Sequence, residues 1–300
     1  MADYNVDYST VKKPQQEQPL TQEEAKILYQ CAIDIKFFIR NFVRIQNPTK
    51  GSVFFDMREY QERIIDSLIN DQFIIGNLPR QSGKSSIVAA YMLHQAIFYE
   101  DMKIGIASNK LVNAKEIMDR IKYMYENLPW FLKTPVIEYN KQSVRFSNYS
   151  SIEVATTTES SFRGKSLSRI LLDEFAFVKP SVAEEFWNAL LPTITAEGIE
   201  GSDTKLIIIS TPNGTEGMYA DLWFGAINDD NGFTPIRVES HEIPGRDEKF
   251  KTEMLKKMSL TKYLQEFECV GYDTQIDILD EYGIERKAKI GDLYEQHYKP

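Results

Sequence analysis

The chain has 300 residues, 42% hydrophobic and 12% aromatic, which is enough for one large or two small globular domains. No apolar run approaches about 18 residues, and the first residues lack the basic and then apolar layout of a secretory signal, so a membrane span and secretion are not expected. The net charge of −9 gives no overall attraction for nucleic acid, and two cysteines, Cys31 and Cys269, fit a reducing compartment rather than a disulfide framework.

The N-terminal part of the chain is predicted to be mainly helical. Residues 1–20 are polar and are expected to form a flexible arm. Thr21 and Glu24 have the spacing of a capping box, which predicts a helix that continues to about Asn47. A short strand at residues 53–55 and a second helix are expected to follow.

From Phe73 onward, apolar runs typical of buried strands alternate with helical patterns. Further strands are expected at residues 103–107, 136–139, 144–146, 152–155, 168–172 and 205–209, and helices at about 110–127, 181–191 and 215–228. This alternation predicts an α/β fold with a mainly parallel sheet that is covered on both faces, whereas residues 136–155 resemble a meander. Residues 247–268 read as helical, with a restart near Ser259.

A phosphate-binding loop is predicted between the strand at Phe73 and the next helix. It contains Arg80, Gln81, Ser82, Gly83, Lys84, Ser85 and Ser86. In such a loop the amides and the helix N-terminus face the anion, Lys84 reaches the β- and γ-phosphates, and the Ser85 hydroxyl ligates Mg²⁺. The pattern departs from the usual one at Leu78, which stands where a glycine is expected.

A second nucleotide signature lies about 90 residues further on, where the strand at 168–172 ends in Asp173 and Glu174. Asp173 is placed to hold Mg²⁺ directly or through water, and Glu174 to orient and deprotonate the attacking water. Taken alone, these residues are also typical of an acidic strand end that caps the next helix. Together with the lysine loop, they favour ATP hydrolysis.

Three further residues are candidates for contacts with the nucleotide. Arg80 could clamp the γ-phosphate from within the loop. Gln61 stands upstream of the loop, where helicase-like ATPases place a glutamine that reads the adenine edge, although a solvent-facing glutamine fits the spacing nearly as well. Thr211 or Ser210, at the end of the strand at 205–209, could sense the γ-phosphate, and the alternative is an ordinary Pro-Asn-Gly turn.

Arg163 has two functional interpretations. It could be an arginine finger that reaches into the site of a neighbouring subunit. It could equally contact DNA phosphates, as could Lys165 and Arg169.

In combination these motifs resemble the ATPase domain of the large terminase subunits of tailed phages, over about residues 25–268. The matching segments are MREYQ at 57–61, RQSGKS at 80–85, FRGKS at 162–166, LLDEFAF at 171–177 and STPNG at 210–214. The departure at Leu78 is shared with that family. A superfamily-2 helicase is the rival enzyme, but the roughly 90 residues after Gly214 are too few for its second RecA domain. A nucleotide-dependent switch without catalysis is the other alternative.

The resemblance implies a RecA-like core and ATP-driven translocation of double-stranded DNA. It implies a ring of copies, expected to be a pentamer, that works with a portal protein and a small terminase subunit. The expected location is the host cytoplasm and, transiently, the procapsid. Relatives continue into a nuclease domain, and only 32 residues follow Glu268 (300 − 268), so nuclease activity is not assigned to this chain.

The sequence changes character at Cys269 and then resembles the opening of an intein. Asp-Thr follows a few residues on, and IGDL stands at 290–293. Cys269 would attack the carbonyl of Glu268 to form a thioester. The later intein elements do not follow, so the segment resembles the N-terminal fragment of a split intein that is completed by a separate nuclease-bearing chain. The alternative is a truncated terminase in which Cys269 is a core cysteine.

The predicted organisation is therefore a flexible arm at 1–20, an ATPase domain at 21–245, a helical linker at 246–268 and a short β-rich intein fragment at 269–300.

Overall fold

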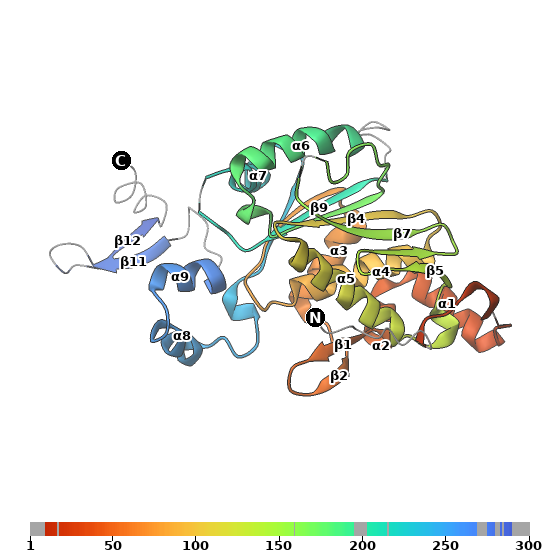
Figure 1. Cartoon of the computed structure of the whole chain (residues 1–300). Helices are drawn as coiled ribbons and strands as arrows, with labels where there is room; N and C mark the ends of the chain where they lie inside the picture. The colour runs from red at the N-terminus through yellow and green to blue at the C-terminus, as the bar shows by residue number, and fades with distance from the viewer. Residues whose placement is uncertain are drawn as a thin grey trace.

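The computed structural model of the protein describes residues 10–16, 18–158, 160–194, 203–214, 216–268, 275–279, 283 and 285–289. Its centre is an eight-stranded sheet with helices on both faces (Figure 1). Among these residues, no helix is both long enough and apolar enough to cross a bilayer.

The sheet is parallel over most of its width, as the alternation of strands and helices predicts. Its order is β10 (Thr234–Arg237), β3 (Phe73–Asn77), β9 (Lys205–Ser210), β8 (Arg169–Asp173), β4 (Lys103–Ser108), β7 (Ser151–Thr156), β6 (Ser143–Phe146) and β5 (Val136–Tyr139). Neighbours from β10 to β7 are parallel, and β7, β6 and β5 form the expected antiparallel meander. Strand β10 is not among the predicted strands.

Two apolar cores lie on the two faces of the sheet. Strand β9 shows why: Ile207 and Ile209 belong to one core, whereas Leu206 and Ile208 belong to the other. Such a strand is buried on both faces and therefore reads as a continuous apolar run. Helices α3 (Glu59–Asn70), α4 (Lys84–Phe98) and α5 (Leu111–Glu126) cover one face, and α6 (Pro180–Ile194) and α7 (Met218–Ile227) cover the other (Figure 1).

The N-terminal helix differs from its prediction. The capping box of Thr21 and Glu24 is present, but the helix breaks at Asp34 into α1 (Gln22–Ile33) and α2 (Ile35–Phe42). The Asp34 side chain accepts a hydrogen bond from Phe37 N at 2.9 Å, and this N-cap starts the second helix. The last predicted helical residues form β1 (Arg44–Asn47), which pairs with β2 (Gly51–Phe54).

Part of the predicted flexible arm is packed against the rest of the chain, namely residues 10–12, whereas residues 13–16 are exposed. Val11 is 3% exposed and belongs to the core. The Lys12 carbonyl accepts a hydrogen bond from Val136 N at 2.8 Å, and Lys133 Nζ donates to the Thr10 carbonyl at 2.7 Å. Residues 1–9 and Glu17 lie outside the described residues.

Residues 246–268, called the linker below, are mainly helical, which agrees with the helical pattern of the sequence from Asp247 onward. They contain α8 (Glu248–Leu255), α9 (Leu260–Tyr263) and a π-helical turn at Leu264–Glu268. A hairpin of β11 (Gln275–Leu279) and β12 (Glu285–Lys289) follows, and among the described residues these strands pair only with each other (Figure 1). Cys269 and the IGDL segment at 290–293 lie outside the described residues.

Candidate functional site

The segment between β3 and α4 forms a tight loop anchored to the sheet. Leu78, at the position that departs from the usual pattern, is 1% exposed, and its N–H donates to the Ser210 carbonyl at 2.9 Å. Two left-handed residues, Gln81 (φ 58°) and Gly83 (φ 77°), turn the chain into the helix. The loop therefore ends at the N-terminus of α4, where backbone N–H groups are available to an anion.

Gln61, on α3, forms a hydrogen bond with this loop. Its Nε2 donates to the Ser82 carbonyl at 3.2 Å, and its Oε1 accepts from Arg58 N at 3.0 Å. Tyr60 donates to the same Ser82 carbonyl at 2.6 Å. A Cβ on Gly83 would lie 2.6 Å from Gln61 Nε2, so the glutamine packs directly against the loop glycine. An adenine contact of Gln61 stays a prediction.

Lys84 and Glu174 meet although they are far apart in the sequence. Lys84 Nζ donates to Glu174 Oε1 at 2.7 Å, and the two side chains are 9% and 19% exposed. The other carboxylate oxygen, Oε2, accepts from Ser210 Oγ and Thr211 Oγ1, each at 3.4 Å. The predicted lysine, carboxylate and threonine thus lie together at the carboxyl ends of β8 and β9, where ligands of parallel sheets bind.

Asp173 ends β8 directly beside this cluster. It is 4% exposed, and its Oδ1 is buried without a hydrogen-bond donor among the described residues. Burial raises the pKa of the Asp173 carboxyl to about 7, and the charge of Glu174 adds to this rise while Lys84 and Arg120 oppose it. A buried, unpartnered carboxylate oxygen and the loop hydroxyl of Ser85 are the kind of hard oxygen ligands that Mg²⁺ prefers.

Arg120 is a functional candidate that the sequence did not reveal. It lies on α5, and its Nη1 donates to Ser86 Oγ, in the first turn of α4, at 3.2 Å. Its charge acts on Asp173. A single arginine on an amphipathic helix belongs to no sequence motif. Arg120 can be identified only from the way in which α5 packs against α4.

Arg80 contacts the linker rather than the cluster. Its side chain is 59% exposed, and its guanidinium forms an ion pair with Glu266. Its N–H donates to the Glu266 carbonyl at 2.9 Å, and its own carbonyl accepts from Arg246. The next linker residue toward the N-terminus, Gln265, donates to Asn213 Oδ1 at 3.0 Å. The linker therefore contacts the phosphate loop and the loop after β9.

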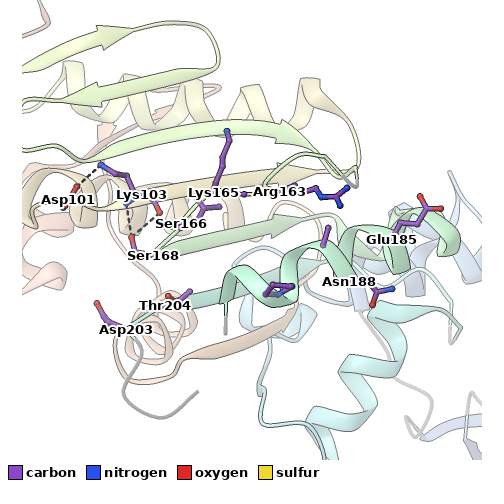
Figure 2. Close-up of a pocket in the computed structure, with 14 residues that line it drawn as sticks. Asp101, Lys103, Arg163, Lys165, Ser166, Ser168, Glu185, Asn188, Asp203 and Thr204 are labelled. Atoms are coloured by element: carbon purple, nitrogen blue, oxygen red, sulfur yellow. Dashed lines mark hydrogen bonds and ion pairs between the residues drawn. The ribbon is translucent and has the colours of Figure 1, made fainter. Parts of the chain in front are cut away.

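Arg163 lies in the wall of a groove of about 1150 Å³ between the loop at 163–168 and α6 (Figure 2). The groove reaches Ser168 and Thr204, which immediately precede the parallel strands β8 and β9. It therefore extends to the N-terminal ends of these strands, opposite their carboxyl ends. Neither Lys84 nor Glu174 lines it. Arg163 is thus placed apart from the cluster of its own chain.

The two other basic residues with a DNA interpretation are engaged within the chain. Lys165 pairs with Glu153 at 2.5 Å. Arg169 is 3% exposed, donates from Nε to Gln95 at 3.1 Å and pairs with Asp203 at 2.8 Å. The interpretation of Arg169 as a phosphate contact is therefore wrong, because a buried guanidinium cannot reach a DNA backbone.

Several solved structures with a similar fold are large terminases or their ATPase domains. The ATPase domain of the large terminase of Thermus phage P74-26 has a TM-score of 0.59 and 20% identity, covering 72% of this chain and 95% of that one. The HK97 large terminase has a TM-score of 0.65 and 15% identity, covering 82% and 56%. The large terminase of a thermophilic bacteriophage, in complex with ADP, has a TM-score of 0.57 and 12% identity, covering 75% and 56%. At these identities the likeness establishes the fold.

The chain therefore spans about half the length of the last two large terminases. The family follows from the sequence itself. Residues 75–281 match the family described as "Terminase large subunit, T4likevirus-type, N-terminal", and this match covers more than half of the chain. It includes the loop lysine, both acidic residues and the Ser210–Thr211 pair, and it favours the terminase over the helicase alternative. The chain belongs to the family of N-terminal domains of T4-like terminase large subunits.

Proposed function

We propose that this chain is the ATP-hydrolysing motor part of a viral terminase large subunit, which drives double-stranded DNA into procapsids. The observation that carries the proposal is the contact of Lys84 Nζ with Glu174 Oε1 at 2.7 Å, at the end of the phosphate loop. A lysine for the phosphates and a carboxylate for the attacking water are two groups that phosphoryl transfer needs. Family membership and the ADP complex of the thermophilic phage terminase favour the same substrate.

Lys84 is paired with Glu174 in this structure. When ATP enters, its β- and γ-phosphates offer Lys84 a stronger negative charge than one carboxylate does. Lys84 then turns to the phosphates and leaves Glu174 Oε1 free to accept the proton of the attacking water. Oε2 stays near the hydroxyls of Ser210 and Thr211, which keep the carboxylate oriented.

Asp173 and Ser85 fit a magnesium ion. Asp173 supplies a buried oxygen without a hydrogen-bond donor among the described residues, and Ser85 follows the loop lysine on α4. When bound there, Mg²⁺ would neutralise charge on the β- and γ-phosphate oxygens. Glu174 keeps its place beside this pair because its backbone is left-handed (φ 53°) and its N–H donates to the Ile209 carbonyl at 2.9 Å.

The remaining predicted site residues have proposed roles around Lys84, Asp173 and Glu174. Gln81, Ser82, Gly83 and Ser86 belong to the phosphate loop and its helix start, and Gln61 is assigned to the adenine side. Arg80 would clamp the γ-phosphate once it leaves Glu266, and Thr211 would sense phosphate loss through Glu174. Arg163 would act in the site of a neighbouring copy, which suits its position away from Lys84 in its own chain.

Packaging needs partners beyond this chain. The proposal includes a pentameric ring of copies, a portal protein, a small terminase subunit and a nuclease-bearing half. The host cytoplasm and the procapsid are the proposed locations.

The test is ATP turnover with and without DNA and portal, with Glu174→Gln as the variant. We expect kcat to fall at least about 100-fold because glutamine cannot act as the general base. ATP binding should be kept because glutamine has nearly the same size and shape as glutamate. Glu184→Gln, an exposed carboxylate on α6, is the matched control and is expected to turn over ATP like the wild type. Equal turnover by the wild type and Glu174→Gln under all conditions would overturn the motor function.

We also propose that residues 269–300 are the N-terminal fragment of a split intein. The hairpin β11–β12 supports a separate unit, because among the described residues its strands pair with each other and not with the main sheet. The family match continues to residue 281, so it includes the start of this segment. The alternative is that the hairpin belongs to the terminase itself.

In the splicing step, Cys269 Sγ attacks the carbonyl carbon of Glu268. The peptide bond breaks, a thioester forms, and the nitrogen is released as the α-amine of Cys269. A matching C-intein chain with a nuclease half should then give a ligated product. Cys269→Ala should abolish that product, whereas Cys31→Ser should keep it. An unchanged yield with Cys269→Ala would refute splicing and leave the motor proposal untouched.

A further inference from the structure

Arg120 is the one arginine of α5, and it reaches across to the first turn of α4. Its Nη1 lies 3.2 Å from Ser86 Oγ, two residues beyond Lys84. Helical side chains lean toward the N-terminus of their helix, and both α4 and α5 begin at the carboxyl edge of the sheet. The guanidinium is therefore directed toward the edge at which the nucleotide cluster lies.

Most of the hydrogen-bond donors of the Arg120 guanidinium are not engaged by the described residues. A guanidinium carries five N–H donors, and only the contact to Ser86 engages one of them among the described residues. No described carboxylate forms an ion pair with it, although Glu116 and Asp119 share its helix. The Arg120 side chain is exposed, so it can change its partner.

The position of Ser86 indicates which part of a nucleotide would lie nearest. In a phosphate loop the lysine reaches the β- and γ-phosphates, the next hydroxyl ligates Mg²⁺, and the backbone at the helix start faces the α- and β-phosphates. Ser86 belongs to that helix start. A guanidinium bound to its hydroxyl is thus beside the α/β side of the phosphate chain and not beside the γ-phosphate.

We propose that Arg120 is a nucleotide-binding residue that exchanges Ser86 Oγ for oxygens of the α- and β-phosphates. This inference rests on the proposed ATP site. Because these phosphates remain after hydrolysis, Arg120 binds ATP and ADP alike. Its role is separate from that of Arg80, whose proposed target is lost with the γ-phosphate.

The experiment measures the affinity of the full chain for ADP and for adenosine by calorimetry. Arg120→Ala should weaken ADP binding by about tenfold or more, since charge-assisted hydrogen bonds to phosphate are lost, and should leave adenosine binding unchanged. Arg120→Gln keeps a donor for Ser86 but loses the charge, so it should behave like Arg120→Ala. Arg120→Lys should recover part of the affinity.

Lys115→Ala removes another cation of α5 and is expected to bind ADP like the wild type. In ATP turnover, Arg120→Ala should raise KM more than it lowers kcat. The inference fails if Arg120→Ala binds ADP within about twofold of the wild type, if Arg120→Gln retains wild-type affinity, or if adenosine binding weakens equally, which would reveal a structural role. A wild type that binds no ADP at all would overturn the proposed function instead.

Discussion

Glu266 of the linker binds Arg80 of the phosphate loop through both its main chain and its side chain. The Arg80 N–H donates to the Glu266 carbonyl at 2.9 Å, and the guanidinium pairs with the carboxylate. The Glu266 side chain is 6% exposed and also pairs with Lys262 at 2.7 Å. The residue proposed to clamp the γ-phosphate is therefore held by the segment that follows the nucleotide-binding part of the chain.

Glu266→Gln is expected to tighten binding of a non-hydrolysable ATP analogue by about threefold to tenfold. Arg80 must leave its ion pair to reach the γ-phosphate, and the apparent affinity is reduced by the fraction of chains in which it is still held. The amide keeps the size of the carboxylate but removes its charge. ADP binding should not change, because ADP lacks the γ-phosphate.

Glu253→Gln is the matched control for Glu266→Gln, since Glu253 pairs with Lys256 at 2.7 Å on the exposed side of the same linker. It should bind the analogue like the wild type. An unchanged or weaker affinity in Glu266→Gln would contradict competition between the linker and the nucleotide for Arg80.

Gly83→Ala is expected to weaken ATP binding strongly, by about tenfold or more. Gly83 has a φ of 77°, and an added Cβ would lie 2.6 Å from Gln61 Nε2. A left-handed alanine costs about 1 kcal/mol by itself, and the clash must also move Gln61 away from the Ser82 carbonyl. Affinity for ATP and thermal unfolding are the measurements.

Gly164→Ala separates these two effects. Gly164 has a similar φ of 74°, but nothing lies within 4 Å of the place that an added Cβ would take, so it carries the backbone cost alone. We expect the backbone strain to lower the free energy of unfolding of Gly164→Ala by about as much as it does in Gly83→Ala. The affinity of Gly164→Ala for ATP should equal that of the wild type. If both variants bind ATP equally well, the packing of Gln61 against Gly83 does not contribute to ATP binding.

The nucleotide cluster could be predicted from the sequence because of the sheet topology. Parallel strands place their carboxyl ends at one edge, so Asp173, Glu174 and Thr211 had to lie near the loop that follows β3. The same alternation of buried strands and helices predicts the mainly parallel sheet. Neither inference needs the position of a single side chain.

The contacts that the sequence does not reveal depend on how packed elements are rotated and docked. Arg120 meets Ser86 only because α5 lies against α4 in one rotation, and Arg80 meets Glu266 only because the linker returns to the loop. Strand β10 has four residues with Pro235 among them, so it carries little strand pattern. The break at Asp34 escapes prediction because apolar periodicity continues across it.

His94 is a buried titratable group on α4 that contacts the N-terminal helices. It is 2% exposed, its Nε2 donates to the Cys31 carbonyl at 2.8 Å, and its ring packs against Phe38 and Phe98 with centroids 5.5 and 4.9 Å away. Burial lowers the pKa of His94 to about 4, although the hydrogen bond to Cys31 and the charge of Asp34 act in the opposite direction.

The low pKa of His94 predicts an acid-sensitive fold. In the unfolded chain the pKa is near the ordinary 6.5, so as the pH falls the unfolded state takes up the proton first, and stability is lost between about pH 6.5 and 4. The difference between these two pKa values corresponds to roughly 3 kcal/mol at most. Denaturant unfolding at several pH values should show that His94→Gln loses less stability over this range than the wild type, whereas His241→Gln, whose side chain is 76% exposed, behaves like the wild type. Identical pH slopes for the wild type and His94→Gln would show that His94 is protonated without cost in the folded protein.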